Sequence, residues 1–151
     1  MEEFIMSQET FDRLWQRVQG AESAVPRHNP SDALRRFLDD TAQSLALERR
    51  LQSRCGDFML LCRETRSRLR RLLAAYYLQT GERYCLPETC PVRGGLLPDL
   101  RADCLAARAR AERYAAAAQS VPDDLAALYE TLSAEEQTHS ERLAALLCRL
   151  L

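Results

Sequence analysis

The last helical pattern of the chain, which follows Pro122, constrains the fold more than any other segment. Leucines recur in it at helical spacing: Leu125, Leu128, Leu132, Leu143, Leu146 and Leu150. Glu136 and His139 fall on the same face and interrupt this apolar stripe. A carboxylate and an imidazole three residues apart that face a core are typical of helical bundles that hold two iron or manganese ions. The segment therefore predicts a long helix with a polar site on its buried face.

The composition favours an all-α protein. A chain of 151 residues is one domain, long enough to bury a sizeable core. Isoleucine occurs once and valine four times, whereas alanine and leucine dominate, and a shortage of β-branched residues disfavours strands. The net charge of −1 gives no overall basicity of the kind that attracts nucleic acid or membrane surfaces.

No segment predicts a secretory signal or a membrane span. The first residues, Met1 to Ile5, have no basic run and no long apolar run. No apolar stretch approaches the roughly 20 residues that cross a bilayer. We therefore expect a cytoplasmic protein that binds neither membrane nor nucleic acid. In that compartment the six cysteines are expected to be reduced thiols, or metal or redox groups, rather than disulfides.

The pattern divides the chain into three parts. Residues 1–19 contain a short amphipathic helix, residues 20–30 read as a proline-containing linker, and residues 31–151 form the main domain. The apolar side of the first helix consists of Phe11, Leu14, Trp15 and Val18. This helix either packs on the main domain or acts as a tethered peptide that docks in the groove of a partner.

The main domain predicts four long helices in two hairpins. Short turns near Gly56 and Ser120 join the first helix to the second and the third to the fourth. The connection between the second and third helices, residues 81–97, is longer. Two tight hairpins joined by a longer crossover predict an antiparallel four-helix bundle of the ferritin-like type.

Several segments resemble one superfamily. Residues 105–147, with Ala-Glu-Arg-Tyr at 111–114 and Glu-Glu-Gln-Thr-His at 135–139, resemble the second half of rubrerythrin-like proteins of the ferritin-like superfamily. Residues 73–81 and 11–15 resemble small bacterial ferritin-like domain proteins of uncertain role. The resemblance implies that each half supplies a Glu seven residues before a Tyr, then Glu-x-x-His. Together these residues would hold two irons that reduce peroxide or oxygen.

Carried over residue by residue, the resemblance gives a depleted site. Glu136 and His139 match the Glu-x-x-His of the second half. The third-helix Glu falls on Ala107, although its companion Tyr114 is present. In the first half the corresponding Glu falls on Thr41. Neither alanine nor threonine supplies the carboxylate that iron requires.

The second helix departs furthest from the pattern. An internal repeat aligns the two hairpins and places the first Glu-x-x-His on Thr65 and Arg68, and the first-half Tyr on Glu48. If the alignment of the second helix is shifted by one residue, Glu64 takes the place of the glutamate ligand, but Ser67 then takes the place of the histidine. At most three of the six ligands that the resemblance implies are then left.

Arg68 changes the expected electrostatics of the bundle centre. A guanidinium repels a metal ion, whereas it satisfies a buried carboxylate through paired hydrogen bonds. We interpret Arg68 as a metal-surrogate cation that neutralises Glu136 across the bundle. Under the alternative interpretation, a residual or rearranged metal site uses Glu136, His139, Glu64 and Glu48.

Other motifs give weaker indications. Cys85 and Cys90 lie in the crossover, and Cys104 near the start of the third helix is close enough to join them in a thiol site. The other interpretation is that they are ordinary thiols. The many arginines of the first two helices alternate with acidic residues, which indicates a solvated charged face. The chain has no glycine-rich phosphate loop and no serine-nucleophile motif.

Two classes of function remain open from the sequence. The first is a bundle without catalysis or cofactor that binds neither membrane nor nucleic acid. Its outer faces and N-terminal helix would bind a partner protein or a second copy in a homodimer. The second is a rubrerythrin-type peroxidase or ferroxidase with a reduced or rearranged iron site. The shortage of carboxylate ligands favours the first class.

Overall fold

The computed structural model describes residues 13, 29–88 and 94–151, and these residues form four helices and no strand. The helices are α2 (Pro30–Gln52), α3 (Phe58–Thr80), α4 (Leu96–Ala118) and α5 (Asp123–Leu150). The predicted all-α class and the four helices of the main domain are confirmed. The predicted N-terminal helix and linker lie almost wholly outside the described residues. No described helix combines the length and the hydropathy that a bilayer crossing requires.

Local sequence explains where the helices of the first hairpin begin and end. Asn29 caps α2, since its side chain accepts a hydrogen bond of 3.3 Å from the backbone N–H of Ser31. Pro30 follows in the first turn, where its missing N–H costs nothing. At the C-terminus of α3, Gly81 ends the helix with a φ of 72°, a left-handed conformation that glycine adopts without strain.

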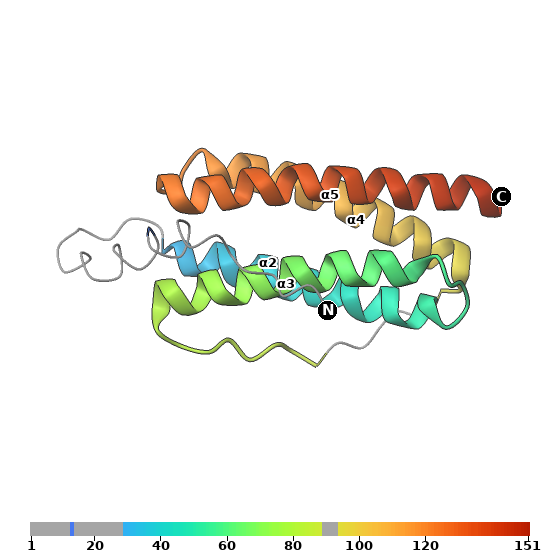
Figure 1. Cartoon of the computed structure of the whole chain (residues 1–151), viewed down its shortest axis with the longest axis horizontal. Coiled ribbons are helices and arrows are strands. Elements are labelled where there is room, and N and C mark those ends of the chain that lie inside the picture. The colour runs from blue at the N-terminus through green and yellow to red at the C-terminus, as the bar shows by residue number, and fades with distance from the viewer. Residues whose placement is uncertain (1–12, 14–28, 89–93) are drawn as a thin grey trace.

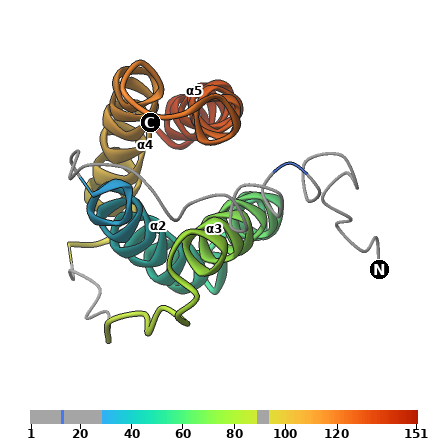
Figure 2. The same cartoon turned by 90° about the vertical axis from the view of Figure 1, so that its left-hand side faces the viewer.

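The helices form two hairpins that lie against each other (Figure 1). Within each hairpin, α2 packs along α3 and α4 packs along α5. Between the hairpins, α2 meets α4 over a longer stretch than α3 meets α5, and the end-on view in Figure 2 shows the wider separation of α3 from α5. The two hairpins therefore pack closely along α2 and α4 and more loosely along α3 and α5.

The core consists of two apolar clusters at opposite ends of the bundle. One includes Phe37 stacked on Tyr114, with ring centroids 4.0 Å apart, and Leu132. The other includes Leu51 from α2 and Leu143 from α5. On α2, α3 and α5, buried polar residues lie between the positions that supply these two clusters. A polar layer thus crosses the middle of the bundle.

Candidate functional site

The polar layer gathers ionisable side chains that are almost fully removed from solvent. Its charged and polar members at 2% exposure or less are Thr41, Glu48, Thr65, Arg68, Asp103, Arg110, Glu136 and His139. They come from all four helices. Buried charges are unfavourable unless they are paired or bind an ion, so the partners of each charge decide what this layer can do.

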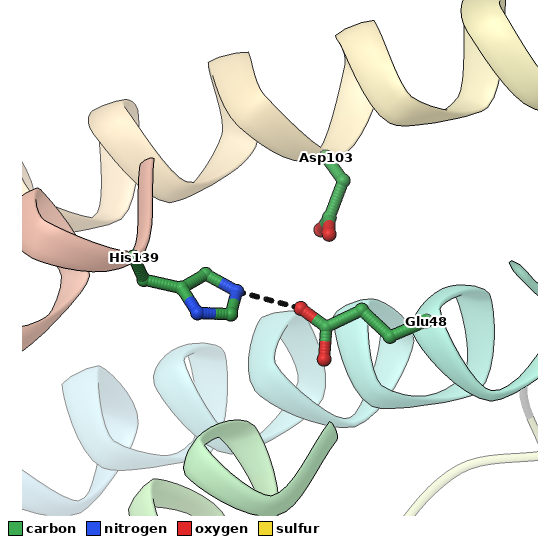
Figure 3. A group of neighbouring side chains, drawn as sticks. All are labelled: Glu48, Asp103 and His139. Atoms are coloured by element: carbon green, nitrogen blue, oxygen red, sulfur yellow. Dashed lines mark hydrogen bonds and ion pairs between the residues drawn. The ribbon is translucent and has the colours of Figure 1, made fainter. Parts of the chain in front are cut away.

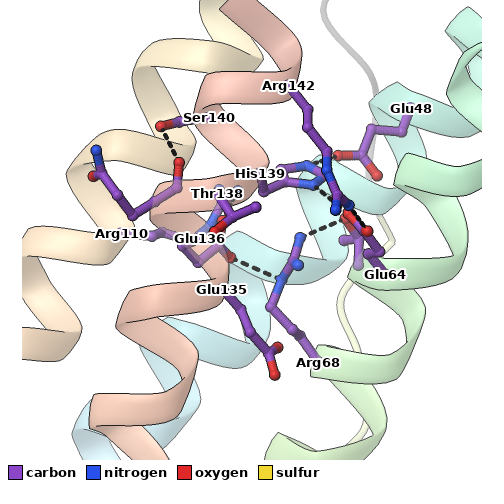
Figure 4. Close-up of polar contacts among 12 residues, drawn as sticks. Glu48, Glu64, Arg68, Arg110, Glu135, Glu136, Thr138, His139, Ser140 and Arg142 are labelled. Carbon is purple, nitrogen blue, oxygen red and sulfur yellow. Dashed lines mark hydrogen bonds and ion pairs between the residues drawn. The ribbon is translucent and has the colours of Figure 1, made fainter.

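The first part of the layer is an arginine–glutamate–arginine cluster, defined as Arg68, Glu136 and Arg110 (Figure 4). Arg110 donates from Nε to Glu136 Oε1 at 3.0 Å and from Nη2 to Oε2 at 3.3 Å. Arg68 Nε lies 3.3 Å from Oε1, and its Nη2 donates to Thr65 Oγ1 at 3.0 Å. One carboxylate from α5 therefore faces two guanidinium groups, from α3 and α4.

The two arginines keep Glu136 ionised. Burial by itself would raise the pKa of this carboxyl, but the charges of Arg110 and Arg68 outweigh burial and lower its pKa. The carboxylate is completely buried. Removal of any member would leave a charge in the core with fewer partners.

The second part is a histidine–carboxylate cluster, defined as Glu48, Asp103 and His139 (Figure 3). His139 Nε2 lies 2.7 Å from Glu48 Oε1. On the other side of the ring, Nδ1 lies 3.4 Å from Glu64 Oε2. Arg142 pairs with the same Glu64 carboxylate. The imidazole from α5 thus lies between carboxylates from α2 and α3.

Asp103 from α4 completes this cluster. Ser44 Oγ donates to Asp103 Oδ1 at 3.0 Å. Burial, together with the neighbouring Glu48 carboxylate, raises the pKa of Asp103 to about 8. Glu48, Asp103 and His139 each offer one ligand atom, and these atoms lie within 4.8 Å of one another. No other group of three such side chains with this spacing occurs among residues 13, 29–88 and 94–151.

The structure divides the residues expected from the sequence between the two clusters. Glu48 and Glu64 both contact His139. Glu136 is directed instead to arginines, and one of them is Arg68, the residue expected as its cation. The four residues expected as a residual metal site therefore do not converge on one point.

Sequence reasoning missed Asp103 and Arg110, both at most 1% exposed. A signal for them existed. Asp103 and Arg110 are seven residues apart and share a helical face with Leu100, Ala107 and Tyr114. Polar residues that interrupt an apolar stripe indicate a buried polar site, as Glu136 and His139 do on α5.

The residues present do not fit the dinuclear iron centre that the resemblance implies. The resemblance assigns ligands to Thr41, Thr65 and Ala107, which are completely buried and offer no carboxylate. Arg68 occupies a fourth ligand position, where its guanidinium pairs with Glu136. Two divalent ions at this point would meet cations instead of the carboxylates that offset their charge.

The expected thiol site falls partly outside the described residues, because Cys90 does. Cys85 is exposed, and Cys104 is half-buried; both are free thiols. Cys104 Sγ donates to the carbonyl oxygen of Ser140 at 3.5 Å, and burial raises its thiol pKa. A protonated thiol with this partner behaves as a small core side chain.

Comparison with known proteins finds no similarity on which to base a family. No family model, no curated protein and no solved structure matches this chain. The resemblance to rubrerythrin-like proteins therefore rests on the residues of the sequence alone, and the function must be argued from the polar layer.

Proposed function

We propose that this chain is a ferritin-like bundle in which the arginine–glutamate–arginine cluster stands where related proteins hold two irons, and that it acts as a structural or protein-interaction module. The observation that carries the proposal is the position of Glu136 between Arg68 and Arg110. A carboxylate that already faces two guanidinium groups has no unpaired charge to offer a metal ion.

The burial of this cluster supports a structural role. A buried ion pair adds little net stability compared with apolar residues of the same size, but it penalises any arrangement that separates the partners. Because Glu136, Arg68 and Arg110 come from α5, α3 and α4, their pairing favours one relative position of the two hairpins. A fixed bundle of this kind suits a protein that presents its outer surface to a partner.

The outer surface offers apolar groups for such a partner. Met59 and Tyr77, both more than half exposed, are eighteen residues apart on α3 and so lie on one helical face. At a rise of about 1.5 Å per residue they lie about 27 Å apart, so they offer a partner two separate apolar contacts rather than one patch. A second copy of this chain or a different protein would serve as the partner, in the cytoplasm under our expectation from the sequence.

Loading with iron tests this proposal. We expect the purified protein, loaded anaerobically with Fe²⁺ and desalted, to retain fewer than two ions per chain and to show no peroxidase turnover. Two neighbouring irons together with turnover would contradict the proposal. Size-exclusion chromatography with light scattering, applied to the wild type and to Tyr77→Ser, tests for a homodimer through this face.

A second candidate function is an iron-binding redox protein with a rearranged site. The observation that favours it is the contact of His139 with Glu48 and Glu64, which brings an imidazole and two carboxylates together without Glu136. The same iron-loading experiment separates the two candidates, because only the redox protein should consume peroxide.

A further inference from the structure

We infer that the histidine–carboxylate cluster, Glu48, Asp103 and His139, is a binding site for a single divalent first-row metal ion. This inference goes beyond the proposed function, which concerns the two-iron position around Glu136. The site would be mononuclear, and two of its three ligands lie at positions that the rubrerythrin resemblance does not use for iron. Its Glu48 stands at the family's tyrosine position, and Asp103 lies one helical turn before Ala107.

The geometry needs little change to hold an ion. The three ligand atoms lie within 4.8 Å of one another. Ligands at about 2.0–2.2 Å from one ion are themselves roughly 3–3.5 Å apart. The 2.7 Å contact between His139 Nε2 and Glu48 Oε1 would open slightly, and Asp103 would move toward it. Such shifts are within the reach of side-chain torsions.

Unsatisfied oxygens in the cluster point to a ligand. Glu48 Oε2 and Asp103 Oδ2 are buried and have no hydrogen-bond donor among the described residues. Glu48 is completely buried and Asp103 is 1% exposed. Buried polar atoms almost always have a partner, so two orphaned carboxylate oxygens beside one imidazole need an explanation. A divalent cation would bind both oxygens, in place of the proton that Asp103, with its raised pKa, can share with Glu48.

The surrounding contacts resemble those that orient metal ligands. A histidine that binds a metal through one ring nitrogen commonly donates its other N–H to a carboxylate, and ligating carboxylates are hydrogen-bonded in turn. Here Glu64 faces His139 Nδ1 at 3.4 Å and is itself held by Arg142. Ser44 holds Asp103 through Oδ1. With its proton on Nδ1, the imidazole would turn the lone pair of Nε2 toward the carboxylates.

An open pocket gives the cluster a route to solvent. A pocket of about 610 Å³ is lined by Ser44, Asp103 and Arg110, among other residues of α2 and α4. An ion could enter beside Asp103, and water could complete the coordination from the same side. Arg110 borders this route, but its guanidinium is engaged with both oxygens of Glu136.

The donor set selects the class of ion. One imidazole nitrogen and two carboxylates suit Mn²⁺, Fe²⁺ or Zn²⁺, whereas the imidazole disfavours Ca²⁺ and Mg²⁺. Mn²⁺ is the best probe for this chain, because thiolates bind it poorly and the six cysteines would compete for Zn²⁺.

Titration of the full chain with Mn²⁺, followed by electron paramagnetic resonance of the free ion, tests the site. We expect one Mn²⁺ per chain and a spin-echo modulation from one imidazole nitrogen. Glu48→Gln and Asp103→Asn should each weaken the affinity at least tenfold, and Glu64→Gln should weaken it less. Circular dichroism checks that the variants fold.

Asp99→Asn is the matched control. It removes another nearly buried carboxylate from α4, one turn away, that pairs with Arg50 rather than with the cluster. The control should keep the wild-type affinity. Absence of Mn²⁺ binding, binding without a nitrogen signal, or equal affinity in Asp103→Asn would each overturn the single-ion site. None of these results would touch the proposed function, which fails instead if two neighbouring irons bind and reduce peroxide.

Discussion

The two clusters of the polar layer include residues one turn apart on α5, Glu136 and His139, but they differ in how their charges are paired. In the arginine–glutamate–arginine cluster, both oxygens of Glu136 lie within 3.3 Å of a guanidinium nitrogen. In the histidine–carboxylate cluster, Glu48 and Asp103 each keep one buried oxygen without a donor among the described residues. One polar layer can therefore combine a closed cluster, whose charges are all paired, with an open cluster that keeps oxygens free for a ligand.

The largest effect is expected from the closed cluster. Glu136→Ala would leave Arg68 and Arg110 buried without their shared carboxylate, and we expect a loss of about 3–5 kcal/mol in the free energy of unfolding. Urea denaturation followed by circular dichroism measures it. The control is Glu135→Ala, which removes the adjacent, partly exposed carboxylate that pairs with Arg71 and should cost at most about 1 kcal/mol. Equal losses in both variants would contradict the closed cluster.

A smaller effect is expected for Arg68→Ala. Arg68 forms an ion pair with Glu136 but no hydrogen bond, and Arg110 would still satisfy the carboxylate through two hydrogen bonds. The loss should therefore stay below the roughly 3–5 kcal/mol expected when a buried pair loses its only partner. The same denaturation series measures it. If a metal ion rather than Arg68 neutralised Glu136, this substitution would leave the stability unchanged.

The next effect concerns how the free energy of unfolding contributed by Glu136 depends on pH. The pKa of Glu136 is lower in the folded chain than its ordinary value. Its contribution is therefore present above the ordinary pKa of a glutamate, about 4.3, and is lost as the pH falls through the lower, folded value. Glu136→Gln should reduce the loss of stability between pH 5 and the acid range, measured by thermal unfolding. An unchanged acid slope would mean that Glu136 is not held ionised.

The smallest effect is expected in the open cluster. Ser44→Ala removes the hydrogen bond to Asp103 and should lower the free energy of unfolding by about 0.5–1.5 kcal/mol. Urea denaturation detects it in the absence of added metal. A loss as large as that of Glu136→Ala would show that both clusters are equally closed.

The sequence was sufficient for the helices because periodicity and local end signals determine them. Pro30, Gly81 and Pro122 stand at helix ends, and the leucine stripe of α5 placed Glu136 and His139 on its buried face. Sequence reasoning also chose Arg68 as the partner of Glu136, and the structure brings the two together. Its role in place of a metal stays a prediction.

The sequence was not sufficient for the partners from α4. Alanines are spread around that helix, so the contrast between its buried and exposed faces is weak in the sequence. Asp103 and Arg110 therefore resemble ordinary solvent-exposed residues. Which charges meet in the core depends on the rotation of each helix against the others. Neighbours along one helix do not determine that rotation, so the contacts that Asp103 and Arg110 make with the other helices become visible only in three dimensions.

Anomalous diffraction from crystals soaked in Fe²⁺ locates each ion relative to Glu136 and His139, and so decides whether arginines or metal ions neutralise Glu136. We expect no ion between Arg68 and Glu136, and at most one peak, beside Glu48, Asp103 and His139. Two neighbouring peaks bridged by the Glu136 carboxylate would show that metal ions occupy the place we assign to the arginines.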